Sequence, residues 1–159
     1  MKAKTVLIIS VSVLLCAFIC FLSVPRRVSL EKEGICWSAA DDALDEAETL
    51  CIDGAVHRHL FKEKEFIGTV KVDGVEQVYT KDVPIFLHRD RGVLWGSLGF
   101  YDSDKNRITV YGTIFFGEGF DDIVIMRSDE ETVFSFPADD RAQAVETANR
   151  TLGTLGFEY

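Results

Sequence analysis

The sequence predicts a mainly β protein: an antiparallel meander forming a sandwich or a partly open barrel, with a C-terminal helix packed on it and an N-terminal transmembrane helix. Three observations indicate this class. An uncharged stretch occupies residues 5–24. From Thr49 onward, short runs of β-branched and aromatic residues alternate with turn residues. Finally, apolar residues recur at helical spacing within residues 141–152.

The N-terminal stretch is long enough to cross a membrane. Residues 5–24 follow Lys2 and Lys4 and precede Pro25-Arg26-Arg27, and a helix of this length covers about 30 Å, the thickness of the hydrocarbon core. We therefore expect residues 1–27 to anchor a single-pass protein of the cell membrane, with the C-terminal domain extracytoplasmic. The alternative is a cleaved signal and a secreted protein, although no small-x-small cleavage site is visible.

Length and charge limit the possible roles of the chain beyond the anchor. Residues 28–35 read as a polar stalk, and residues 36–159 are enough for one domain. Without Lys2 and Lys4, 15 basic residues face 26 acidic ones, so the rest of the chain carries a formal charge of −11. We therefore expect no nucleic-acid partner, because such partners are bound through basic surfaces.

Beyond the anchor, the cysteines are Cys36 and Cys51. In an oxidising compartment, a pair of this kind predicts a disulfide. Two buried reduced thiols are the alternative.

The domain begins with a stretch that resembles a short helix. Ala40, Ala43, Leu44 and Ala47 recur at three- and four-residue spacing after Ser38. The acidic residues among them would then lie on the wet face of that helix.

Strands are expected over most of the remaining chain. The runs are LCI, AVHRHLF, FIGTVKV, VEQVYT, IFL, VLWGSLGFY, ITVYGTIFF, DIVIM and TVFSF. Asp73-Gly74 is the strongest hairpin signal, because a type I′ turn needs positive φ at both central residues. Alternation places Phe66, Val70 and Val72 on one face.

In the strand from Val110 to Phe116, both faces are apolar. Such a strand is expected to be covered on one side by the core of the sheet and on the other side by the last element of the chain. That element is a helix from about Arg141 to Leu152, in which Asp140 and Gln143 form the N-terminal cap and Gly153 ends the helix. Its apolar stripe is expected to be Ala142, Val145, Ala148 and Leu152.

No motif with specific catalytic or cofactor-binding spacing occurs. His57 and His59 would project to the same face of a strand, but metal ligation is not the expected role, and neither catalytic nor metal residues nor cofactors are assigned. Glu118, Asp121 and Asp122 surround Phe120 at a strand end, where carboxylates could converge for acid-base chemistry. A charged turn is the alternative for this acidic group.

The segments ETLCIDGAVHRHLF, EFIGTVKVDG, WGSLGFYDSDKNRITVYGTIFF, DDIVIM and FPADDRAQAVETAN resemble a group of uncharacterised small membrane-anchored or secreted β-domain proteins of Gram-positive, clostridia-type bacteria. The resemblance covers most of residues 48–152. It implies a cell-envelope location and an all-antiparallel domain, and it supplies no catalytic residues.

The sequence therefore favours a non-catalytic binding or interaction module of the cell envelope, attached to the membrane through residues 5–24. Its partner would be a protein or an envelope polymer, and the candidate contact residues are Trp95, Tyr101 and Tyr111. The alternative is a small hydrolase or metal-dependent enzyme that uses His57, His59 and the Glu118, Asp121 and Asp122 group.

Overall fold

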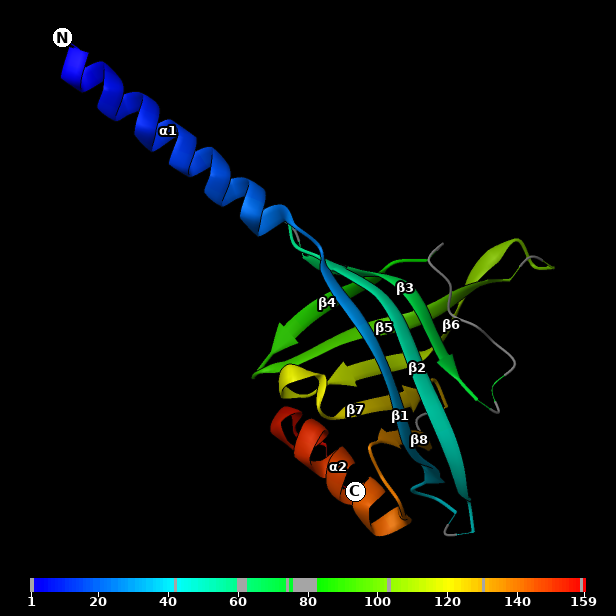
Figure 1. Ribbon diagram of the computed structural model, residues 1–159. Helices are drawn as coiled ribbons and strands as arrows, with labels where there is room; N and C mark the ends of the chain where they lie inside the picture. The colour runs from blue at the N-terminus through cyan, green and yellow to red at the C-terminus, as the bar shows by residue number, and fades with distance from the viewer. Residues whose placement is uncertain are drawn as a thin grey trace.

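The computed structural model describes residues 2–41, 43–59, 63–73, 75, 83–102, 104–129, 131–157 and 159, except for the side chains of residues 2–5, 20, 22 and 23. Figure 1 shows a helix that projects from a β domain, with a second helix against the domain's outer surface. The elements are α1 (Lys2–Ser23), β1 (Arg26–Ser38), β2 (Asp45–His57), β3 (Lys64–Val72), β4 (Ile85–Asp90), β5 (Val93–Asp102), β6 (Arg107–Phe116), η1 (Glu118–Phe120), β7 (Ile123–Arg127), β8 (Thr132–Phe136), α2 (Arg141–Leu152) and η2 (Gly153–Leu155).

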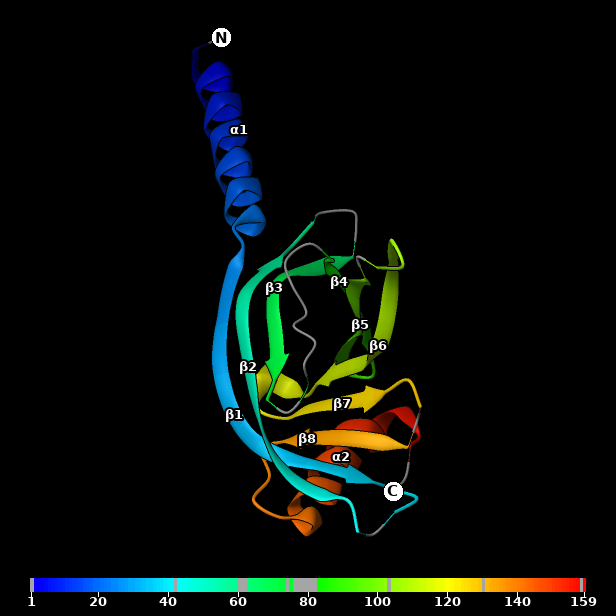
Figure 2. The ribbon, with the colours of Figure 1, turned by 90° about the vertical axis from the view of Figure 1, so that its right-hand side faces the viewer.

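The sheet closes into a barrel in which every strand is antiparallel to the next along the chain. The closing contact joins β1 to β8 and pairs Cys36 with Phe134 and Trp37 with Val133. Figure 2 shows the resulting ring of strands. The predicted sandwich or partly open barrel is therefore wrong, because the last strand returns to pair with the first.

Alternation along the strands fills the barrel interior. The inward side chains form one cluster that includes Leu50, Ile52, Val70, Leu98 and Ile114, each almost completely buried. This cluster occupies the middle of the barrel. The predicted inward row Phe66, Val70 and Val72 belongs to it.

Helix α2 covers part of the outer surface, in contact with β1, β6, β7 and β8. It has the predicted bounds, and the Asp140 side chain accepts a hydrogen bond from the Gln143 amide. Ala148 and Leu152 of the predicted stripe are buried and Val145 is partly buried, whereas Ala142 is exposed. The buried face comprises Ala144, Thr147, Ala148, Thr151 and Leu152. Small side chains on this face allow the helix to approach the sheet closely.

The expectation of a transmembrane helix needs correction. Helix α1 forms, and its apolar side chains from Val6 to Ile19 are exposed to solvent. Over the part of the chain that the structure describes, however, no helix has both the length and the apolar character that crossing a membrane requires.

Two further predictions near the start of the domain are wrong. Residues 28–35 are not a stalk but part of β1, because Val28 and Leu30 turn inward and pair with β2. Residues from Ser38 onward do not form a helix: the Ser38 hydroxyl accepts hydrogen bonds from the amides of Ala40 and Asp41, and β2 begins at Asp45. The local helical spacing is overridden by pairing with β1.

The segment between β3 and β4 carried two predictions. The strand expected over residues 75–80 lies, apart from Val75, outside the described residues. Gly74, the second residue of the predicted hairpin turn, lies outside them as well.

The predicted disulfide does not form in this fold. Cys36 and Cys51 are both free thiols. The register places Cys51 opposite Glu31, five residues before Cys36 on the same strand. That offset separates the two cysteines by roughly 17 Å along the sheet, whereas a disulfide requires Cα atoms within about 7 Å.

We therefore predict that iodoacetamide in denaturant, without reductant, alkylates both Cys36 and Cys51. In the folded protein at pH 8, Cys36 should react far more slowly than Cys51. Cys36 is buried, and burial together with Glu48 and Glu46 raises its pKa to about 11, which leaves roughly one thiol in a thousand ionised. Mass spectrometry of the peptides measures both results, and recovery of a linked Cys36–Cys51 peptide would contradict the register.

Candidate functional site

One end of the barrel opens into a cavity of about 530 Å³. The inward rows of the strands continue beyond the packed core and become its walls. We call this cavity the acidic mouth, and it is lined by Cys36, Leu44, Glu46, Glu48, Val75, Phe100, Thr109, Val110, Tyr111, Arg127, Ser128, Thr132 and Phe134. Its volume is within the range of about 300–1,000 Å³ that is typical of small-molecule sites.

A β-bulge determines which side chains of β6 enter the mouth. The register passes from Leu98 opposite Gly112 to Gly99 opposite Val110, so Tyr111 is the extra residue. A bulge shifts the alternation of the strand beyond it. Val110 is therefore 55% exposed at the edge of the mouth, and the bulge lets its neighbours Tyr111 and Thr109 line the mouth as well.

Carboxylates dominate the charge of the mouth. Glu46 and Glu48 are two residues apart on β2 and therefore share a face. Burial, followed by the nearby carboxylates of Glu46 and Asp73, raises the pKa of Glu48 above its ordinary value of 4.5. Arg127 brings a positive charge to the wall, but its Nε is 2.7 Å from the Asp129 carboxylate. The group of two glutamates, Arg127 and Asp129 thus carries a formal net charge of −2.

Two further ionisable groups in the mouth are neutral at physiological pH. Burial is the main cause that raises the pKa of Cys36 to about 11, and burial likewise raises the pKa of Tyr111 to about 12. The Cys36 thiol is therefore a poor nucleophile at neutral pH. The Tyr111 phenol keeps its proton and can donate a hydrogen bond.

The mouth also contains a polar atom that has no partner in the described part of the chain. The hydroxyl oxygen of Thr109 is buried and makes no hydrogen bond there. Leaving a buried hydroxyl unpaired costs about 1–3 kcal/mol.

Taken together, the mouth is lined by two carboxylates and the Tyr111 side chain, between apolar walls formed by Phe100 and Phe134, among others. Carboxylates held this close favour a cation, and an aromatic wall adds to the attraction. The arrangement therefore suits an organic cation that has an apolar body.

The three predicted contact aromatics are not brought together. Tyr111 lies in the acidic mouth. Trp95 is half-buried on the barrel's outer surface, where its ring lies 4.6 Å from the ring of His88. Tyr101 is 52% exposed near the β5–β6 turn, and its hydroxyl donates a hydrogen bond to Asn106.

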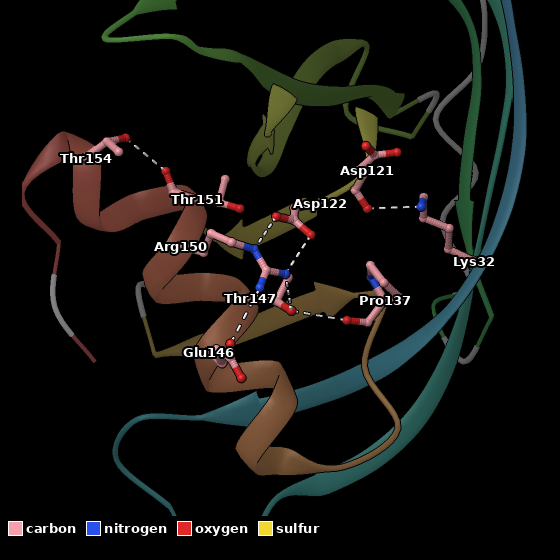
Figure 3. A network of polar contacts seen from close by, with 9 residues as sticks. All are labelled: Lys32, Asp121, Asp122, Pro137, Glu146, Thr147, Arg150, Thr151 and Thr154. Atoms are coloured by element: carbon pink, nitrogen blue, oxygen red, sulfur yellow. Dashed lines mark hydrogen bonds and ion pairs between the residues drawn. The ribbon is translucent and has the colours of Figure 1, made fainter. Parts of the chain in front are cut away.

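The predicted acidic group has a structural contact instead. Figure 3 shows Asp122 facing Arg150 of α2, with Nε–Oδ2 and Nη2–Oδ1 distances of 2.6 and 2.8 Å. The neighbouring Asp121 uses its backbone carbonyl, which accepts a hydrogen bond from Lys32 Nζ of β1 at 3.0 Å. These contacts fix the helix and the first strand to the loop before β7.

His57 is the last residue of β2, and the other two histidines form separate pairs. His59 is 3.1 Å from Glu65, and His88 is 2.9 Å from Glu63. Among the residues that the structure describes, no three His, Cys, Asp or Glu side chains converge to form a metal site.

Sequence reasoning missed Glu46, Glu48 and Arg127 as site residues. A signal was present for the glutamates, because they precede Leu50 and Ile52 at the two-residue spacing of one strand face. The helical spacing around Ala43 and Ala47 led them to be assigned to a helix. Arg127 follows Ile123 and Ile125 at the same spacing, at the end of the predicted strand DIVIM.

Comparisons of this chain with protein-family models, with curated proteins and with solved structures find no match.

Proposed function

We propose that this protein is a non-catalytic binding module whose acidic mouth binds an amine or another organic cation attached to an apolar group. The observation that carries the proposal is the pair Glu46 and Glu48 at the rim of a cavity with apolar walls. The natural partner would be a protein or an envelope polymer that presents such a cation.

The electrostatics of the mouth support a cationic ligand. The pKa of Glu48 is raised by burial and by two nearby carboxylates, so the folded protein disfavours its ionised form. A bound cation would offset both the burial and the repulsion. The neutral states of Cys36 and Tyr111 support binding without a covalent step, because neither group is ionised near neutral pH.

The N-terminal sequence supports a location outside the cytoplasm. Lys2 and Lys4 precede the uncharged residues 5–24, an order that resembles an export signal. A module exported in this way would meet envelope polymers and extracellular proteins.

Hexylamine, hexanol and hexanoate form a matched series that tests the proposal, because they share an apolar chain and differ in charge. We expect hexylamine to bind the full-length protein more tightly than either analogue in isothermal titration calorimetry. Glu48→Gln should weaken hexylamine binding about tenfold, as expected for loss of a charge-assisted contact. Glu31→Gln, which removes an exposed carboxylate of β1, is the matched control and should change the affinity less than about twofold.

Loss of binding in Glu48→Gln should not come from unfolding. The pKa of Glu48 is raised in the folded state, so protonated Glu48 contributes to the stability of the fold. This contribution is complete below pH 4.5 and is lost as the pH rises through the raised pKa. The variant avoids this loss and should be at least as stable as the wild type at neutral pH. Equal binding of hexylamine and hexanol, or equal effects of the two substitutions, would contradict the proposal.

A further inference from the structure

The opposite end of the barrel carries the opposite charge. A cavity of about 140 Å³ lies there, and its lining includes four cationic side chains together with Val56, Leu94 and the segment Gly117–Phe120. We call the four cations the basic rim: Arg26, Arg58, Lys64 and Arg89.

The strand pattern explains why these cations converge. Each is two residues from an inward core residue: Val28 in β1, Val56 in β2, Phe66 in β3 and Leu87 in β4. Arg58 directly follows the last residue of β2, and the other three cations lie within their strands. Since side chains two residues apart share a face, each cation continues an inward row past the end of the core. Four consecutive strands thus direct cations toward a single opening.

Strand pairing brings three of the cations next to one another. His57 of β2 pairs with Glu65 of β3. Because the strands are antiparallel, Arg58, the residue after His57, comes next to Lys64, the residue before Glu65. Lys64 also pairs with Leu87, two residues before Arg89. Burial, with Arg58 and Arg89 as further causes, lowers the pKa of Lys64.

Among the described residues, these charges have no ion-pair partner. Within the described part of the chain, no carboxylate lies at ion-pair distance from any member of the basic rim. Glu118 also lines the cavity, which leaves a formal excess of three positive charges. Like charges on facing strand positions destabilise a sheet, so an anion in the cavity would stabilise this end of the barrel.

We propose that the basic rim binds a phosphate group, either free or as part of a lipid headgroup. Arginine side chains match the geometry of phosphate oxygens through paired N–H donors, and lysine adds a point charge. The small volume of the cavity suits one such group rather than a polymer. This site is independent of the acidic mouth, because the two cavities share no residue.

Inorganic phosphate titrated into the full-length protein by calorimetry tests the site. We expect saturable binding that Arg89→Gln and Lys64→Gln each weaken about tenfold, the effect of losing one charge-assisted hydrogen bond. Lys64 is half-buried, so its substitution can disturb folding. Arg89 is exposed, and its variant therefore tests phosphate binding in a folded protein. Arg107→Gln removes an exposed arginine at the start of β6, away from this cavity, and should change the affinity less than about twofold.

Vesicles distinguish the two sources of phosphate. If the group belongs to a lipid, vesicles that contain phosphatidic acid should retain the wild type at least about fivefold better than Arg89→Gln, and phosphatidylcholine vesicles should not distinguish the two proteins. If the group is free phosphate, only the calorimetric difference should appear. Failure of both assays to separate Arg89→Gln from the wild type, or an equal loss in Arg107→Gln, would overturn the proposal.

Discussion

Replacing Trp37 by Ala is expected to lower the free energy of unfolding by about 3–5 kcal/mol, the usual cost of removing a buried aromatic side chain. Trp37 is 1% exposed and belongs to a second hydrophobic cluster, which also includes Val133 of β8 and Ala144 and Ala148 of α2. Its Nε1 donates a hydrogen bond to Ser135 Oγ at 3.0 Å, and the Tyr159 ring packs edge-on against it at 5.3 Å. The substitution therefore removes a contact between the barrel, the helix and the C-terminus at once.

Urea unfolding followed by circular dichroism measures this loss. Trp37→Phe should cost less, because the ring remains and only the hydrogen bond to Ser135 is removed. Trp95→Ala is the matched control, since Trp95 is a half-buried tryptophan on the same outer surface of the sheet. A loss in Trp37→Ala no greater than that in Trp95→Ala would show that α2 is not held through Trp37.

Replacing Gly34 by Ala is expected to destabilise the protein by about 3 kcal/mol, the upper part of the range for overpacking. A Cβ atom at Gly34 would overlap the Ser135 carbonyl oxygen and the Phe136 ring. The carbonyl belongs to the backbone of β8, next to the pairs that close the barrel. Relief of the overlap therefore requires β1 and β8 to move apart.

Amide hydrogen exchange and thermal unfolding together measure this effect. Exchange should accelerate most at Ile35 and Ser135, which pair across the closing strands. Gly153→Ala is the matched control, because an added Cβ meets no atom within 4 Å there and the backbone φ is −58°. That substitution should be neutral or slightly stabilising. A similar change in Tm for both variants would argue against a tight approach of β1 to β8.

Local patterns predicted the parts of the fold that depend on local chemistry. Asp140 and Gln143 marked the start of α2, and Leu152 marked its last residue, as the structure confirms. Gly153 does not stop the turns, because it has helical geometry and begins η2, and the left-handed glycine is Gly156. The two-residue alternation through Phe66 and Val70 identified the inward face of β3 in the same way.

The closure of the sheet was beyond such patterns. The pairing of Cys36 with Phe134 joins residues 98 positions apart, and no local propensity specifies it. The polar stretch 28–35 resembled a stalk because its outward residues are charged, while its inward Val28 and Leu30 found their partners only in the closed barrel.

The candidate site was predictable only in part. Tyr111 was chosen as an aromatic contact, but alternation placed it on the face opposite Gly112. The bulge opposite Leu98 and Gly99 interrupts this alternation, so Tyr111 lines the mouth instead. A bulge of this kind has no clear sequence signal. Asp122 looked available for chemistry because its partner, Arg150, lies 28 residues further along the chain on a different element.

The most direct test of a barrel with two oppositely charged ends is an amide chemical-shift map of the full-length protein titrated first with hexylamine and then with inorganic phosphate. Hexylamine should shift amides around Glu48 and Tyr111, and phosphate should shift a separate set around Arg58, Lys64 and Arg89. Shifts of the same amides by both ligands, or no shift at either end, would contradict the assignment of two separate sites.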